Sequence, residues 1–248
     1  MKNFLNTIIN YKNKELKNRK RMKFRFRKAL LNPKFGDIGV IAEIKFASPA
    51  KGVLGHKKNL LSRVLEYQKA KADVISIITD KKFFKGNTRF ISQTRKRISL
   101  PILQKDFVID PLQIYEAKIL GSEAILLIVK IISRKKLKEF VNLAFSLGIE
   151  PVVEINDEKD LEKTLKTRTK FIAVNARNLA TFKVDLASAC QLIKKIPKSF
   201  NIIGFSGVKG REEVEKYQES GAKAVLVGTS LMRAKNIKKF IKVLKDES

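Results

Sequence analysis

The chain has 248 residues, of which 44% are hydrophobic, so it is long enough for two small domains or for one large α/β barrel. No apolar run comes near the ~20 residues that a membrane-spanning helix requires, no signal-peptide core is present, and the single cysteine, Cys190, excludes an intrachain disulfide. We therefore expect a soluble, cytoplasmic protein that has no membrane partner.

The formal net charge of +29, from 53 Lys and Arg against 24 Asp and Glu, is the most unusual feature of the composition. Basic surfaces attract polyanions, so one interpretation is binding to nucleic acid. However, the chain has neither the aromatic signature of an RNA-binding module nor the spacing of a zinc finger. We favour drift towards a lysine-rich composition together with affinity for a phosphorylated substrate, and we expect no nucleic-acid partner.

Residues 1–35 precede the first predicted strand. They contain apolar residues at helical spacing, namely Phe4, Leu5, Ile8 and Ile9. We expect an extra N-terminal helix that acts as a lid or a brace on the rest of the chain. A loosely packed basic tail is an equally good interpretation of Arg19–Lys28.

From residue 36 onward, short apolar runs alternate with segments of helical periodicity. The runs are Val40–Lys45, Asp73–Thr79, Pro101–Lys105, Ala124–Val129, Pro151–Ile155, Phe171–Asn175, Asn201–Phe205 and Ala224–Val227. Several are almost continuous in Ile, Val and Leu, as expected of parallel strands that are covered on both faces. This order predicts a (β/α)8 TIM barrel over 36–248, after an N-terminal helical extension over 1–35, in a single domain over 1–248. A doubly wound open sheet is the alternative, but the short, even units favour closure.

Charged and amide side chains stand where several of these strands end. Glu43 and Lys45 end the first strand and, being two residues apart, point to the same face. Lys105 ends the third strand, Glu154 lies at the end of the fifth, and Asn175 ends the sixth. Any one of them alone fits a structural salt bridge equally well. In a barrel these ends meet at one cavity, and two lysines with two glutamates there indicate general acid–base chemistry.

The ends of the last two strands are followed by small residues instead. Ser206 and Gly207 follow the seventh strand, and Gly228 and Thr229 follow the eighth. Small residues leave backbone N–H groups accessible, and barrels often bind phosphate at these two loops. Arg177, after the sixth strand, would add positive charge. The pair of loops therefore predicts a phosphate site.

Across almost its whole length the chain resembles the indole-3-glycerol phosphate synthase family of barrel enzymes. The matching segments are IAEIKFASPAKG (41–52), DKKFFKGN (80–87), LPILQKDFVIDPLQIYEAKILGSEAILLI (100–128), PVVEIND (151–157), VNARNL (174–179) and GTSLM (228–232). The resemblance implies a carboxy-lyase of tryptophan biosynthesis. This activity closes the indole ring of 1-(2-carboxyphenylamino)-1-deoxyribulose 5-phosphate with loss of carbon dioxide and water. The resemblance also implies no cofactor, no metal, and association with other enzymes of the tryptophan pathway.

The resemblance further implies roles for individual residues. Lys105 is then the general acid that protonates the substrate carbonyl, Glu154 is the general base of the later dehydration, and Lys45 supports or shares the acid role. Glu43 and Asn175 orient the lysines and the substrate hydroxyl groups. The remaining positions bind the substrate and its phosphate: Arg177, Ser206, Gly207, Gly228, Thr229, Ser48 and Phe84. For Phe84, anchoring of its own loop is an equally good interpretation.

Three positions depart from the family pattern. Phe205 stands in place of an acidic residue, Gln104 in place of an arginine suited to the substrate carboxylate, and Ala50 in place of a serine. Phe205 matters most, because the missing carboxylate belongs to the catalytic set. We expect a synthase of reduced activity, in which Phe205→Glu raises turnover. The rival account of this position is that the neighbourhood has repacked around Phe205, so that the residue is core and a buried glutamate there would be an uncompensated charge. The alternative is a decayed barrel that is kept as a basic phosphate-binding, nucleic-acid-binding or scaffold protein.

Overall fold

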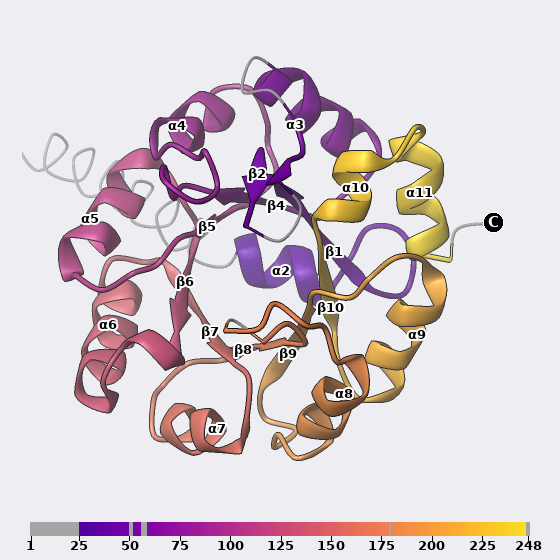
Figure 1. The fold of residues 1–248 in the computed structure, drawn as a ribbon. Helices are drawn as coiled ribbons and strands as arrows, with labels where there is room; N and C mark the ends of the chain where they lie inside the picture. The colour runs from indigo at the N-terminus through magenta and orange to yellow at the C-terminus, as the bar shows by residue number, and fades with distance from the viewer. Residues whose placement is uncertain (1–24, 50–51, 56–58, 179, 247–248) are drawn as a thin grey trace, which may run out of the picture.

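The computed structural model describes residues 25–49, 52–55, 59–178 and 180–246. Eight strands form a closed barrel in the order β1-β10-β9-β8-β7-β6-β5-β4, and β1 pairs in parallel with both β10 and β4 (Figure 1). The strands are β1 Gly39–Ile44, β4 Val74–Ile78, β5 Ile102–Lys105, β6 Ala124–Ile128, β7 Glu150–Ile155, β8 Phe171–Asn175, β9 Asn201–Phe205 and β10 Ala224–Val227. The fold is a (β/α)8 TIM barrel, as the sequence predicts, and the sheet is closed rather than open.

Each predicted strand agrees with an observed strand to within one residue at either end. The strands β8, β9 and β10 have the predicted bounds. Their apolar runs alternate little in polarity because one face packs in the barrel interior and the other against the surrounding helices. Every residue of these three strands is buried except Asn201, which is half-buried, and this confirms the prediction.

Helices form an outer ring around the strands. They are α3 Leu60–Lys69, α4 Arg89–Arg95, α5 Pro111–Leu120, α6 Arg134–Ser146, α7 Glu158–Leu165, α8 Leu186–Lys194, α9 Arg211–Glu219, α10 Thr229–Arg233 and α11 Ile237–Leu244. The chain also forms a 3₁₀ turn, η2 Val129–Ile131, and a separate hairpin of the two short strands β2 Ala47–Ser48 and β3 Gly52–Val53. Five of these helices begin at a residue whose side chain accepts a backbone N–H: Asp110, Ser133, Asp157, Asp185 and Asn236. None of the described helices combines the length and apolarity that crossing a bilayer requires.

Along each strand, alternate residues point into the barrel, and they change from apolar to polar towards the carboxyl end. On β1, Ile41 belongs to the interior apolar cluster, and Glu43, two residues on, lines a cavity. On β5, Leu103 belongs to the same interior cluster, and Lys105, two residues on, lines the cavity. Because residues i and i+2 of a strand share a face, the packed interior leads directly into a polar surface at one end of the barrel.

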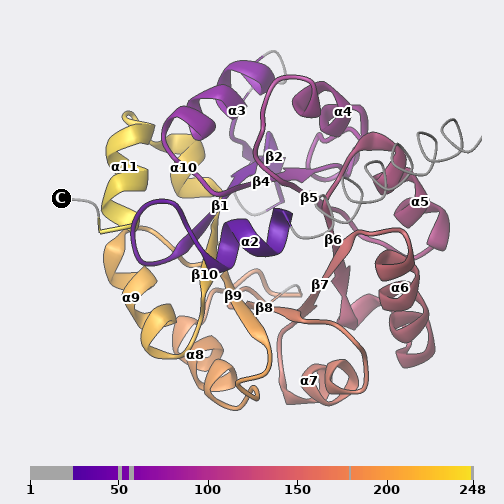
Figure 2. The same ribbon diagram turned by 180° about the vertical axis from the view of Figure 1, so that it is seen from behind.

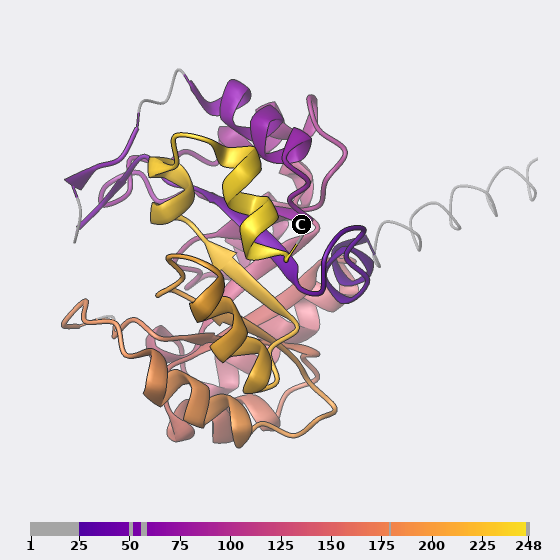
Figure 3. The ribbon, with the colours of Figure 1, turned by 90° about the vertical axis from the view of Figure 1, so that its right-hand side faces the viewer.

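The helix α2 (Arg25–Leu31) closes the barrel at the amino ends of its strands. Phe26 and Leu30 are buried in the interior cluster, and the Phe26 ring meets the Phe171 ring edge-on, with 5.4 Å between centroids. Figures 2 and 3 show α2 at this end and the β2–β3 hairpin at the other. The described part of the extension is therefore a brace, neither a lid nor a loose tail. Residues 1–24, where most of the predicted extra helix falls, lie outside the described residues.

Buried acids pair with cations at this closed end. Glu123 Oε1 lies 2.9 Å from Arg25 Nη1 and 3.0 Å from Arg95 Nη1. Burial raises the pKa of Glu123, and the two arginines oppose that rise. Asp73 Oδ2 lies 2.8 Å from Nζ of Lys245, which is fully buried. The Lys245–Asp73 pair ties the C-terminal end of the described chain to the barrel.

Candidate functional site

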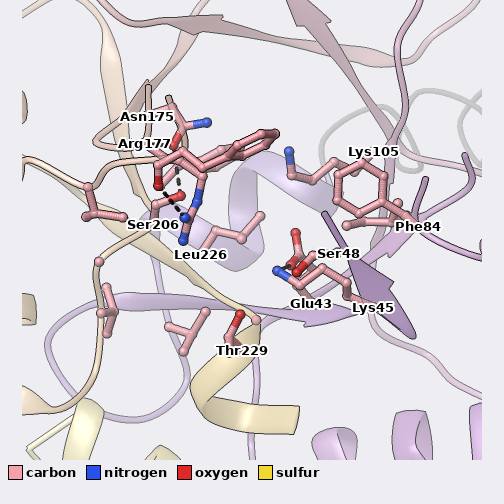
Figure 4. Close-up of a pocket in the computed structure, with 18 of the residues that line it drawn as sticks. Glu43, Lys45, Ser48, Phe84, Lys105, Asn175, Arg177, Ser206, Leu226 and Thr229 are labelled. Atoms are coloured by element: carbon pink, nitrogen blue, oxygen red, sulfur yellow. Dashed lines mark hydrogen bonds and ion pairs between the residues drawn. The ribbon is translucent and has the colours of Figure 1, made fainter. Parts of the chain in front are cut away.

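A cavity of about 960 Å³ opens at the carboxyl ends of the strands. Every residue that the sequence predicts to act in catalysis or binding lines it: Glu43, Lys45, Ser48, Phe84, Lys105, Glu154, Asn175, Arg177, Ser206, Gly207, Gly228 and Thr229. In Figure 4, Lys105 and Phe84 lie on one side of the cavity and Arg177 and Ser206 on the other. The closed barrel explains this gathering, because it brings strand ends that are far apart in the sequence to one rim.

Glu43 and Lys45 form an ion pair at the end of β1, with 2.9 Å between Lys45 Nζ and Glu43 Oε1. Glu43 is almost fully buried, so the neighbouring ammonium offsets the cost of burying a carboxylate. Gly228 packs against this pair. A Cβ atom on Gly228 would lie 2.2 Å from Glu43 Oε1 and 3.3 Å from Lys45 Nζ. Only glycine fits here without moving the pair.

Lys105 and Glu154 face each other at a longer distance. Lys105 Nζ lies 3.6 Å from Glu154 Oε2, and that buried oxygen has no hydrogen-bond partner among the described residues. The other carboxylate oxygen accepts a 3.0 Å hydrogen bond from the Asn175 side-chain amide. Asn175 Oδ1 accepts in turn from Ser206 Oγ at 2.8 Å and from the Arg177 backbone N–H at 3.0 Å. One oxygen of Glu154 is thus fixed by a network, and the other is paired only with the Lys105 ammonium among the described residues.

The loops after β9 and β10 form the opposite side of the cavity. Ser206 has a φ of 69° and Gly207 a φ of 84°, so the backbone passes through the left-handed region where β9 ends. The Tyr217 hydroxyl holds this turn, because its one proton is shared between the carbonyl oxygens of Phe205 at 2.9 Å and Ser206 at 3.0 Å. After β10, the helix α10 begins directly behind Gly228. Small residues in two adjacent loops leave room for an anion.

Arg177 lies at the same side of the cavity (Figure 4). Its Nη1 atom donates a 2.8 Å hydrogen bond to the carbonyl oxygen of Phe182, which fixes the guanidinium in place. The remaining N–H groups of an arginine suit a phosphate or carboxylate. Within the described part of the chain, no group of three or more His, Cys, Asp and Glu side chains is arranged to hold a metal ion.

Phe205 is both a core residue and part of the cavity wall. It ends β9, belongs to the interior cluster and is 1% exposed. The ammonium of Lys105 lies 5.4 Å from the centroid of its ring. The position to which the sequence assigns a missing carboxylate is therefore adjacent to the predicted general acid.

Gln104 does not face the cavity, so its predicted place near the substrate carboxylate is wrong. It precedes Lys105 on β5 and therefore points to the opposite face of the sheet. There it is fully buried, and its Oε1 atom accepts a 3.5 Å hydrogen bond from Ser122 Oγ. The other departure, Ala50, lies outside the described residues.

Sequence reasoning missed several polar residues of the cavity wall, including Asp80, Asp106, Lys209 and Arg233. Asp80 Oδ1 accepts the backbone N–H groups of Phe83 at 2.7 Å and Phe84 at 3.0 Å, and so fixes the loop that presents Phe84. Asp106 accepts a hydrogen bond from the Thr79 hydroxyl, and burial raises the pKa of its carboxyl group. Both acids stand just after strand ends, and this is the signal that identifies them.

The fold and the cavity define a (β/α)8-barrel enzyme whose cavity is lined by lysine and glutamate side chains at the carboxyl ends of the strands. Residues 5–244 match the family model described as indole-3-glycerol phosphate synthase. The chain is 40% identical over 250 residues to the indole-3-glycerol phosphate synthase of Caldanaerobacter subterraneus subsp. tengcongensis, covering 96% of this chain and 97% of that protein. It is 42% identical over 201 residues to the synthase of Aliarcobacter butzleri, covering 81% and 76%. The chain therefore belongs to the indole-3-glycerol phosphate synthase family.

Solved structures share the fold at low sequence identity. A chain of the tryptophan synthase complex from Pyrococcus furiosus has a TM-score of 0.64 at 19% identity, covering 85% of this chain and 98% of that chain. A 3-hexulose-6-phosphate synthase has a TM-score of 0.68 at 14% identity, covering 85% and 99%. These likenesses support the barrel fold alone.

Proposed function

We propose that the chain converts 1-(2-carboxyphenylamino)-1-deoxyribulose 5-phosphate to indole-3-glycerol phosphate, carbon dioxide and water. One observation supports this most strongly: the Lys105 ammonium stands 3.6 Å from a Glu154 oxygen that has no hydrogen bond among the described residues. An acid and a base at one site suit a reaction in which a carbonyl first gains a proton and a ring carbon later loses one.

In the ring closure, the aromatic carbon that bears the carboxylate attacks the ketone carbon of the deoxyribulose chain. Lys105 donates a proton to the ketone oxygen, which becomes a hydroxyl group. The carboxylate then leaves as carbon dioxide, and its bonding electron pair returns to the ring and restores aromaticity. Lys45, paired with Glu43 at 2.9 Å, supports or shares the acid role.

In the dehydration, Glu154 removes a proton from the carbon next to the ring nitrogen. The hydroxyl group leaves as water with a proton from Lys45, and the double bond of the five-membered ring forms. The 3.0 Å hydrogen bond from Asn175 to Glu154 supports this role, because it orients the carboxylate. Catalysis by such positioned groups typically contributes about 10²- to 10⁴-fold each.

The substrate is held from both sides of the cavity. Its phosphate binds at the two small-residue loops and the nearby guanidinium: Ser206, Gly207, Gly228, Thr229 and Arg177. Ser48 and Phe84 contact the rest of the substrate. The ring centroids of Phe84 and Phe107 lie 6.2 Å apart, and an aromatic wall of this kind suits the carboxyphenyl ring.

The proposed reaction uses a phosphorylated small molecule and no cofactor. We further propose that the chain acts as one domain in the cytoplasm, in association with other enzymes of the tryptophan pathway. A decayed scaffold is not favoured, because the acid–base residues Lys105 and Glu154 are together at the cavity. A nucleic-acid partner is not part of the proposal.

Growth of a bacterial strain that lacks its own indole-3-glycerol phosphate synthase tests the proposal. The chain should restore growth without tryptophan, whereas Lys105→Ala should not. Lys166→Ala, which changes an exposed lysine of the outer surface, is the matched control and should restore growth fully. No growth with the wild-type chain, although folded protein accumulates, would contradict the proposed function.

A further inference from the structure

Lys45 and Lys105, both of which line the cavity, are held in different ways. Lys45 Nζ lies 2.9 Å from Glu43 Oε1, in a close ion pair. Lys105 Nζ lies 3.6 Å from Glu154 Oε2 and 5.4 Å from the centroid of the Phe205 ring. Lys105 therefore lies between the Glu154 carboxylate, which is farther from it than Glu43 is from Lys45, and the face of the Phe205 ring. That ring is within the range of a cation–π contact.

A cation–π contact orients an ammonium group without taking up its N–H donors. The negative face of the ring attracts the whole charge, whereas a carboxylate accepts individual N–H groups. The donors of Lys105 therefore remain available to a substrate oxygen. A carboxylate at position 205 would compete with the substrate for them.

We propose that Phe205 is a positioning residue for Lys105. Its ring holds the ammonium at 3.6 Å from Glu154, so that this ion pair does not tighten to the 2.9 Å of the Lys45–Glu43 pair. The inference rests on the proposed function. It opposes the expectation from the sequence that Phe205→Glu raises turnover.

The surroundings of Phe205 make its ring a rigid wall. The side chain is 1% exposed and belongs to the interior cluster that includes Leu226 and Ile128. Its carbonyl oxygen accepts hydrogen bonds of 2.9 Å from both the Tyr217 hydroxyl and the Ala176 backbone N–H. A side chain packed in this way occupies one well-defined rotamer, as positioning requires.

Kinetics of Phe205→Leu test the inference, because leucine keeps an apolar side chain but has no π face. We expect kcat to fall about 2- to 30-fold, the factor that a cation–π contact provides between exposed and desolvated settings, with KM unchanged. Phe171→Leu is the matched control. Phe171 is also 1% exposed and lies in the same interior cluster, but it contacts Phe26 at the closed end of the barrel. This control should lower the melting temperature similarly and leave kcat unchanged.

The chemical shift of the Lys105 side chain gives a readout that does not need turnover. In protein labelled with ¹³C at the lysine Cε, the Lys105 signal is assigned by its absence in Lys105→Arg. Its ε protons should be shifted upfield by the ring in the wild type and in Phe171→Leu. In Phe205→Leu they should return to the position of exposed lysines.

Three results would overturn the inference: a wild-type kcat in Phe205→Leu, an upfield shift that survives in Phe205→Leu, or a gain in kcat of about tenfold or more in Phe205→Glu. The last result would restore the expectation from the sequence. If the wild type turns over and any one of these three results is obtained, the inference falls alone. If the wild type shows no turnover, the proposed function falls.

Discussion

Replacing Gly228 by alanine tests how closely the loop after β10 packs on the Glu43–Lys45 pair. The new Cβ atom would lie 2.2 Å from Glu43 Oε1, and real Cβ atoms essentially never approach a heavy atom below 3.0 Å, so the carboxylate or the loop must move by 3.0 − 2.2 = 0.8 Å or more. A displacement of about 1 Å at a catalytic group can cost about 10²-fold in rate. We therefore expect kcat/KM to fall about 100-fold. The φ of Gly228 is −116°, so the effect is steric and not one of left-handed strain.

The assay combines turnover, followed by indole fluorescence, with a melting curve. Overpacking of this kind should also cost about 1–3 kcal/mol of stability. Gly210→Ala is the matched control, because a Cβ atom there would meet nothing within 4 Å, and it should keep the wild-type kcat/KM. Wild-type kcat/KM and melting temperature in Gly228→Ala would refute the reasoning, since the pair would then not pack against Gly228.

Lys105→Ala should lower kcat about 10²- to 10⁴-fold at an unchanged melting temperature, because a methyl group donates no proton. Arg177→Ala should instead raise KM, since it removes charge from the phosphate side; equal, small effects of both changes in steady-state kinetics would show that the cavity is misassigned. Hydrogen bonds from Arg211 lower the pKa of Asp37 from 3.8 to about 2 in the folded chain, so its stabilisation is complete above about pH 4 and is lost as the pH falls from 3.8 towards 2. Asp37→Asn should remove this pH-dependent stabilisation, which is less than about 1 kcal/mol because the pair is partly exposed, and so make the melting temperature fall less steeply at acid pH; an unchanged acid limb would contradict this. Lys245→Met should cost about 3–5 kcal/mol in denaturant unfolding, because it removes one partner of a buried ion pair, and a loss below about 1 kcal/mol would show that the pair is not buried as described.

The barrel and most of its cavity could be predicted because both follow from local patterns. The strands β8, β9 and β10 are short apolar runs with clear ends, and their bounds agree with the prediction. Residues such as Lys105 and Asn175 stand where strands end, and closure of a parallel barrel brings all such ends together whatever the loops do. The prediction therefore needed no contact between distant residues.

Contacts across the barrel could not be predicted in this way. Lys105 and Phe205 belong to β5 and β9, and whether the ring faces the ammonium depends on how the interior packs. Phe26 likewise packs against residues of the barrel interior, and the spacing of apolar residues along the helix α2 does not specify that contact. Gln104 is a different case. Side chains alternate between the two faces of a strand, so the placement of Lys105 in the cavity already turns Gln104 away from it, and the family motif alone is a poor guide to this position.

The reaction of the purified chain tests the central claim most directly. The protein is mixed with 1-(2-carboxyphenylamino)-1-deoxyribulose 5-phosphate in buffer that contains a metal chelator, and both indole fluorescence and carbon dioxide release are followed. We predict turnover with one carbon dioxide released for each indole-3-glycerol phosphate formed, and loss of both signals in Lys105→Ala. No turnover by fresh, folded protein at high enzyme concentration, or indole formation without carbon dioxide release, would contradict the account.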